Sequence, residues 1–172
     1  ACPSMRIADP IDLVYFKRVR YVPAESRQKV YKSMQYFSSA IRRGKTLAAK
    51  LHLNEKHVKK HLSRNDRDDA LTALAFAYFI DRQDEKAWQT IQEPLERAQK
   101  RNPLAPWVAG LTAWRRGDFE NAEKYFRQVA NHPRSIPTLQ SSGAYWATRA
   151  MMKNGQYREV NEYLRRAALA SP

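Results

Sequence analysis

The sequence has few of the residues that favour β-sheets or disulfide frameworks. It contains 5 glycines and 1 cysteine in 172 residues, and runs of β-branched residues are very few. Sparse β-branched runs disfavour strands, whereas helix-forming residues dominate throughout. Cys2 has no second cysteine with which to form an intrachain disulfide. Because no low-complexity linker interrupts the chain, we expect a single all-α domain.

Long apolar runs and catalytic motifs are also missing. No apolar run approaches the ~20 residues that cross a bilayer. The longest, residues 70–80, lies between Asp68, Asp69 and Asp81 and is interpreted as a buried helix. The chain has no glycine-rich phosphate loop, no Gly-x-Ser-x-Gly elbow and no Cys/His nucleophile pair. We therefore predict neither a catalytic residue nor a cofactor.

One helix–turn–helix pattern occurs twice in the C-terminal half. Its copies are WVAGLTAWRRGDFENAEKYF at 107–126 and AYWATRAMMKNGQYREVNEYL at 144–164. In each copy a glycine, Gly117 or Gly155, stands where the first helix must end, since glycine tolerates positive φ there. An aromatic residue two positions later opens the second helix.

Two weaker copies precede these. Arg82 replaces the turn glycine in one, and Gly44 takes that place in the other. The residues expected where paired helices cross are 38, 35 and 38 positions apart: Ala49, Ala87, Ala122 and Val160. A period near ~34–40 residues is typical of two-helix repeats of the tetratricopeptide (TPR) type. The sequence therefore predicts a short superhelical solenoid of TPR-like repeats over 25–172, with units at 25–65, 66–101, 103–133 and 138–170, after an extended docking segment at 1–24.

Apolar spacing also predicts the individual helices of the first half. The predicted helices span residues 25–43 and 84–100, with one or two helices over 45–62 and another that begins within 66–69 and ends at Ile80. Asp66 to Asp69 supply capping candidates, and Pro94 is expected to disturb its helix because proline cannot donate to the helical ladder. The side chains expected to point inward from 45–62 are Leu47, Leu51, Val58 and Leu62.

Positive charge is concentrated in the N-terminal part of the chain. The net charge is +14, and Lys and Arg outnumber Asp and Glu by 11 in residues 1–67 but by only 3 in residues 68–172. Such a field attracts acidic polymers, although it also suits a solvated surface. The candidate binding residues form a basic helical face: Lys56, Lys59, Lys60 and Arg64.

Two other constellations have a simpler interpretation. His57 and His61 stand at i and i+4 with His52 nearby, a spacing that could seat a metal, but the adjacent lysines would repel a cation. We therefore predict no metal site. The aromatic residues on repeat positions are interpreted as inter-helix packing rather than as a ligand cage: Trp107, Trp114, Tyr125, Phe126, Tyr145, Trp146 and Tyr163.

The two C-terminal copies resemble the helical superhelix of soluble lytic murein transglycosylases, especially the α-proteobacterial kind. The pattern that carries the resemblance is Tyr145-Trp146-Ala147-x-Arg149-Ala150, then Gly155, then Tyr163-Leu164-x-Arg166-Ala167-Ala168, within residues 104–170. In that family the superhelix forms a ring or curved wall. It precedes a lysozyme-like domain that cleaves peptidoglycan glycan strands with one glutamate as general acid/base.

The resemblance implies a scaffold rather than the enzyme itself. The catalytic glutamate of the family lies in a Glu-Ser-x-Phe-like motif, whereas Glu25-Ser26 here is followed by Arg27 and precedes the repeats. A periplasmic, non-catalytic scaffold is therefore expected, with any leader removed. Its expected partner is peptidoglycan or a catalytic domain C-terminal to residue 172.

Two alternatives remain open. One is a TPR-like protein–protein adaptor, which a groove lined by Asn, Lys and Arg rather than by aromatic residues would favour. The other, ranked third, is a basic helical-repeat RNA binder. Nucleic acid is disfavoured because base stacking needs exposed aromatic residues, and the basic stretch from Lys56 to Arg64 has none.

Overall fold

The computed structural model describes residues 24–157 and 160–170, and every regular element in these ranges is a helix. The all-α prediction is thus confirmed for these residues, none of whose helices is long and apolar enough to cross a membrane. The predicted docking segment, 1–24, lies outside the described residues except for Ala24. The helices are α1 (Ala24–Arg42), α2 (Thr46–Leu53), α3 (Lys56–His61), α4 (Arg64–Ile80), α5 (Asp84–Ala98), α6 (Leu104–Arg115), α7 (Phe119–Ala130), α8 (Pro137–Lys153) and α9 (Val160–Ala170).

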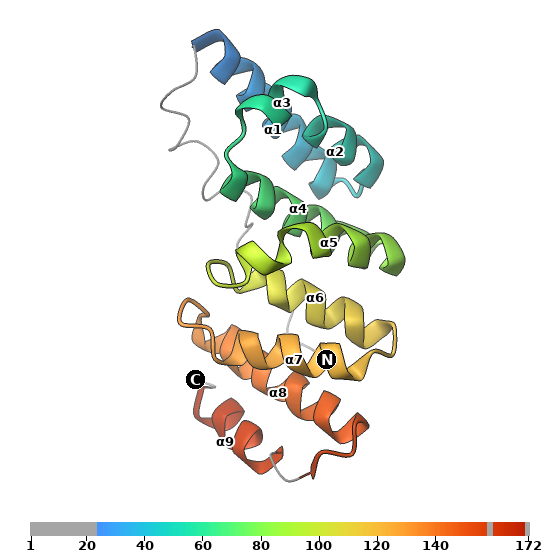
Figure 1. Cartoon of the computed structure of the whole chain (residues 1–172), viewed down its shortest axis with the longest axis vertical. Helices are drawn as coiled ribbons and strands as arrows, with labels where there is room; N and C mark the ends of the chain where they lie inside the picture. The colour runs from blue at the N-terminus through green and yellow to red at the C-terminus, as the bar shows by residue number, and fades with distance from the viewer. Residues whose placement is uncertain (1–23, 158–159, 171–172) are drawn as a thin grey trace.

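The helices follow one another along the long axis of the molecule in chain order, from α1–α3 at one end to α9 at the other (Figure 1). The buried apolar side chains accordingly form three successive clusters rather than one central core. The first joins α1 to α5, the second joins α4 to α7, and the third joins α6 to α9. Each helix is therefore held mainly by its neighbours in the chain.

The turns between paired helices have the backbone conformation that the repeat pattern predicts. Gly44, Gly117 and Gly155 have φ values of 67°, 78° and 74°. Arg82, which takes the place of the turn glycine, has φ 60° and is the one described non-glycine residue with positive φ. The residues predicted at the helix crossings also fit, since Ala49, Ala87 and Ala122 are fully buried and Val160 packs against the third cluster.

The conformation of Arg82 leads to a stability prediction. A non-glycine residue in the left-handed region costs about 1–2 kcal/mol, part of which glycine would recover. We expect Arg82→Gly to raise the free energy of unfolding by about 0.5–1 kcal/mol, whereas Arg82→Ala, which keeps the strain, should leave it nearly unchanged. Urea denaturation of both variants measures the difference. Equal stability of the two variants would contradict the explanation.

The inward face of α2 was predicted wrongly. Leu47 and Leu51 are 68% and 63% exposed, whereas Val58 is fully buried and Leu62 is partly buried. The chain breaks between α2 and α3, so the two helices do not share one continuous face. The short α2 instead buries Ala49 and Leu53 against the first cluster, which turns the two leucines outward.

Two helix boundaries also differ from expectation. Ser63, rather than a residue from 66–69, caps α4, because its Oγ accepts a hydrogen bond of 3.1 Å from the backbone N–H of Asp66. This is the usual geometry of a serine N-cap. Helix α5 ends at Ala98, two residues before the predicted end at Lys100, and the buried Pro94 lies within it.

Candidate basic binding face

The predicted binding residues lie together at one end of the molecule. Lys56, Lys59 and Lys60 belong to α3, and Arg64 opens α4. All four side chains are exposed, and none forms an ion pair with a described residue. The fully buried Val58 anchors α3 to the first cluster, so its lysines face solvent. These four residues are called the basic face below.

The basic face is part of a larger excess of positive charge. Residues 24–64 contain 11 Lys and Arg residues but only Glu25 and Glu55 as acids, and all 11 cations are exposed. Of these cations only Lys29 forms an ion pair within the described residues, with Glu25 at 2.7 Å. Apart from Lys29, the cations of α1–α3 and Arg64 therefore form no ion pair with an acid in the described part of the chain.

Glu55 is bound by polar groups other than the lysines around it. Its Oε1 lies 2.6 Å from Nδ1 of His52, and its Oε2 accepts a hydrogen bond of 2.8 Å from Oγ of Ser33. Nε2 of His57 lies 2.9 Å from the same serine oxygen. Burial acts to raise the pKa of Glu55, but the hydrogen bonds from His52 and Ser33 and the charges of both histidines outweigh it and lower this pKa. The network thus fixes the α2–α3 turn against α1.

No metal-binding cluster arises from these histidines. His52 and His57 contact Glu55, while His61 is partly buried at the end of α3. Across residues 24–157 and 160–170 no group of three potential ligands from His, Cys, Asp and Glu is arranged to hold a metal ion. The short polar contacts around Glu55 therefore support the position of α3 rather than a cofactor.

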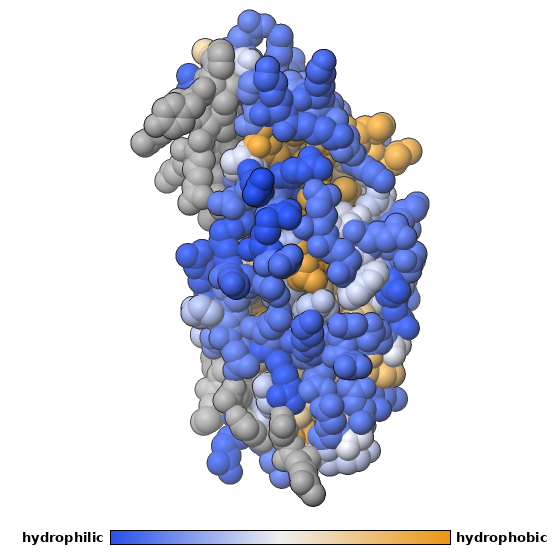
Figure 2. Space-filling model, viewed as in Figure 1, coloured by the Kyte–Doolittle hydropathy of each residue, from blue (hydrophilic) through white to orange (hydrophobic). Residues whose placement is uncertain are grey.

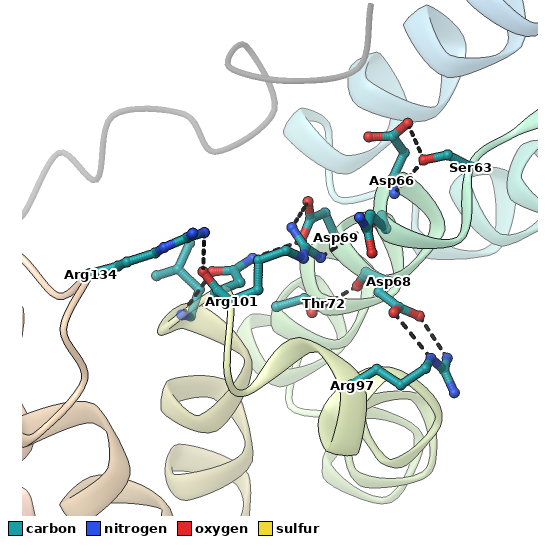
Figure 3. A network of polar contacts seen from close by, with 11 residues as sticks. Ser63, Asp66, Asp68, Asp69, Thr72, Arg97, Arg101 and Arg134 are labelled. Carbon is teal, nitrogen blue, oxygen red and sulfur yellow. Dashed lines mark hydrogen bonds and ion pairs between the residues drawn. The ribbon is translucent and has the colours of Figure 1, made fainter. Parts of the chain in front are cut away.

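Two of the three acids of α4, Asp68 and Asp69, are paired with arginines that follow in the chain, whereas Asp66 contacts Ser63 (Figure 3). Asp68 accepts two hydrogen bonds from Arg97 of α5, at 2.7 and 3.2 Å, and Asp69 accepts two of 2.8 Å from Arg101. These hydrogen bonds raise the pKa of each arginine. Because Asp68 and Asp69 bind these arginines, they do not neutralise the lysines of α3.

The aromatic residues of the repeats serve mainly as packing, as predicted. Trp107, Tyr125, Phe126 and Tyr163 are buried, and the partly buried Trp114 and Trp146 meet edge to face with ring centroids 5.2 Å apart. Tyr145 is the exception, with 44% of its surface exposed. Its hydroxyl accepts a hydrogen bond of 3.0 Å from Arg149, whose guanidinium lies over the rings of Trp114, Tyr145 and Trp146.

Glu25 has the opposite environment to that of a general acid. It lies in the first turn of α1 with its carboxylate exposed. Its hydrogen bond from Lys29, together with the charge of that lysine, lowers its pKa. A carboxylic acid that donates a proton near neutral pH needs a raised pKa in an apolar pocket. Glu25 therefore offers no acid for glycan cleavage.

Comparison of the chain with protein-family models, with curated proteins and with solved structures found no match. No relative therefore supplies a role for any residue. The exposed cations of α1–α3 and the paired acids behind them are the observations that bear on function.

Proposed function

We propose that this chain is the non-catalytic helical scaffold of a periplasmic lytic transglycosylase and that its basic face binds carboxylates on peptidoglycan. The observation that carries the proposal is the basic face, a cluster of exposed cations at one end of the molecule that form no ion pair within residues 24–157 and 160–170. The family resemblance of residues 104–170 supports the choice of peptidoglycan among acidic polymers. A catalytic domain following residue 172 would supply the glycan cleavage.

We further propose that the helices form a short superhelical solenoid of TPR-like pairs. Three pairs of consecutive helices pack together: α4 with α5, α6 with α7, and α8 with α9. The turn within each pair contains a residue of positive φ, which is Arg82, Gly117 and Gly155 respectively. Stacked pairs of this kind present extended surfaces on which a polymer can lie. Such a surface suits a long glycan strand better than a small ligand.

The binding would depend on many weak contacts. A single exposed ion pair contributes about 0–1 kcal/mol, and salt screens it over about 8–10 Å. Repeated peptide stems along a glycan strand present many carboxylates to the same group of cations. Once one contact forms, the next becomes effectively intramolecular, which raises the overall affinity without any strong individual contact.

A peptide-binding adaptor is the second candidate, because one groove has the composition expected for it. This groove lies between α2, α4 and α5, and its polar lining includes Lys50, Asn54, Arg67 and Lys86. Tyr78 is the one aromatic side chain among the lining residues, and it is buried. A groove lined in this way suits an extended peptide with negative charge.

Co-sedimentation with purified peptidoglycan sacculi tests the first proposal. We expect the wild-type chain to bind at low salt, and the variant K56Q/K59Q/K60Q/R64Q to bind about 10-fold more weakly, since four contacts of a few tenths of a kcal/mol to 1 kcal/mol are lost. The matched control K100Q/K124Q/K153Q/R165Q removes the same charge from exposed positions elsewhere and should bind nearly as well as the wild type.

Other results would overturn this proposal. No sedimentation of the wild type at low salt would exclude direct wall binding, and an equal loss in both variants would show that net charge alone determines it. Mass spectrometry of the supernatant should detect no 1,6-anhydromuramyl products, because a scaffold does not cleave. Single-stranded RNA that displaces the chain from sacculi at an equal concentration of charge would favour the RNA-binding alternative.

A further inference from the structure

A partly open cavity of about 250 Å³ lies between α2, α4 and α5, on the groove described above. Its apolar lining comes from buried side chains at the interface of α2 with α4: Leu53, Leu71, Leu74 and Tyr78. Its polar lining comes from the exposed sides of α2 and α5 and from Arg67. Figure 2 shows apolar residues exposed at the level of α2, α4 and α5 between hydrophilic ones.

The cavity exists because α2 and α5 do not close over α4. Further along the chain, Trp88 of α5 packs against Tyr125 of α7 with ring centroids 6.3 Å apart. Between α2 and α5 the cavity is lined instead by Lys50 and Thr90, whose side chains cannot form an aromatic contact of this kind.

The charges around the cavity are complementary to an anion. Three cations line it, Lys50, Arg67 and Lys86, against the single acid Glu93. Nε of Arg67 lies 3.4 Å from Oε1 of Glu93, and that carboxylate is about half exposed. The positive charge around the cavity thus exceeds the negative charge by two.

Arg67 supplies the guanidinium among the residues that line the cavity. Its Nη1 is buried and has no hydrogen-bond partner among the described residues. Nη1 itself is covered by protein, but the Arg67 side chain as a whole is 26% exposed and lines the cavity, so a ligand meets the exposed part of the guanidinium. A carboxylate suits a guanidinium best, because its two oxygens match the geometry of the N–H donors.

We propose that this cavity binds the carboxy-terminal residue of a peptide, with the free α-carboxylate at Arg67 and an apolar side chain against Leu71 and Leu74. Pockets for drug-sized molecules typically have volumes of about 300–1,000 Å³. The smaller volume of this cavity suits a ligand smaller than these, such as one terminal amino-acid residue. The inference extends the adaptor candidate by naming its ligand. It does not depend on the binding of sacculi by the basic face.

Titration of the full ¹⁵N-labelled chain with three small peptides, followed by NMR, tests the proposal. The probes are acetyl-Ala-Leu with a free carboxylate, the same peptide as its C-terminal amide, and acetyl-Ala-Lys with a free carboxylate. We expect the first to shift backbone resonances of α4 and α5 around the cavity. The amide should bind about 10-fold more weakly because it loses the charge-assisted contact, and the lysine peptide should also bind more weakly because its charged side chain does not suit the apolar lining.

Two variants identify the residues responsible. Arg67→Gln and, separately, the exposed Lys86→Gln should each weaken binding of acetyl-Ala-Leu, with about a 10-fold loss for Arg67→Gln. Lys59→Gln, which removes a cation of the basic face outside the cavity, should leave peptide binding unchanged. Thermal melts establish that each variant is folded.

Equal binding of the acid and the amide, or equal losses in Arg67→Gln and Lys59→Gln, would overturn the inference, as would the absence of any shift around the cavity. Co-sedimentation of the Arg67→Gln variant with sacculi shows whether a loss of peptide binding is independent of wall binding by the basic face. We expect that variant to sediment with sacculi like the wild type, so each of the two proposals can fail while the other stands. If the chain instead binds internal peptide segments, the C-terminal amide of acetyl-Ala-Leu should bind as well as the free acid.

Discussion

Gly143→Val is expected to lower the free energy of unfolding by about 3 kcal/mol. Gly143 lies in α8, where a Cβ atom would stand 2.8 Å from the backbone nitrogen of Ala130 and 3.0 Å from the carbonyl oxygen of Phe126. Both atoms belong to the backbone of α7, so no side-chain rotation can relieve the clash. The two helices would have to separate, and Phe126, which is fully buried, would lose contacts with its neighbours.

Equilibrium denaturation in urea measures this effect, with Ser141→Val as the control. Ser141 lies on the same helix, is partly exposed and makes only a local hydrogen bond, so its replacement should change stability by about 0.5 kcal/mol or less. Similar stabilities for the two variants would mean that α7 and α8 do not approach as closely as described.

Arg97→Ala is expected to cost about 3 kcal/mol, because it leaves a carboxylate buried without its partner. The side chain of Asp68 is only 2% exposed and receives both of the hydrogen bonds from Arg97. The pair joins α4 to α5. Its loss should therefore loosen the packing of these two helices.

Arg116→Ala is the matched control for this prediction. Arg116 also forms a 2.7 Å ion pair, with Glu85, but that carboxylate is 65% exposed. Water can replace the lost partner there, so the cost should stay within about 1 kcal/mol. If urea denaturation gave equal losses for the two variants, burial of Asp68 would not be what makes its ion pair important.

The features that the sequence predicts well are local ones. Turn positions depend on one residue and its φ value, so Gly117 and Gly155 could be placed from the pattern, and even the substitution of Arg82 at such a turn was found. The burial of small residues such as Ala87 and Ala122 was also predicted from the spacing of the pattern. An all-α fold follows from composition in the same way.

The features that the sequence misses depend on how helices meet. Leu47 and Leu51 have the spacing of a buried face, but the short α2 buries its opposite side because Ala49 and Leu53 contact the first cluster. Nothing in the local pattern distinguishes these two faces. The capping serine was missed for a different reason, since three aspartates follow it closely and each could have served as the cap.

In the candidate site, too, local features could be predicted and features that depend on packing between helices could not. The exposure of Lys56, Lys59, Lys60 and Arg64 could be predicted from their charge. The pairing of Asp68 with Arg97 could not be predicted, because the two residues are 29 positions apart in the sequence. The position of Glu55 between two histidines, and the cavity beside Arg67, likewise depend on packing between separate helices.

The central claim, that the basic face binds carboxylates of the cell wall, is tested most directly by altering the wall rather than the protein. Purified sacculi would be used before and after their carboxylates are converted to uncharged amides, with the wild-type chain at low salt. We expect the chain to sediment with untreated sacculi and to stay in solution with amidated ones. Equal binding to both, or no binding to untreated sacculi, would contradict it.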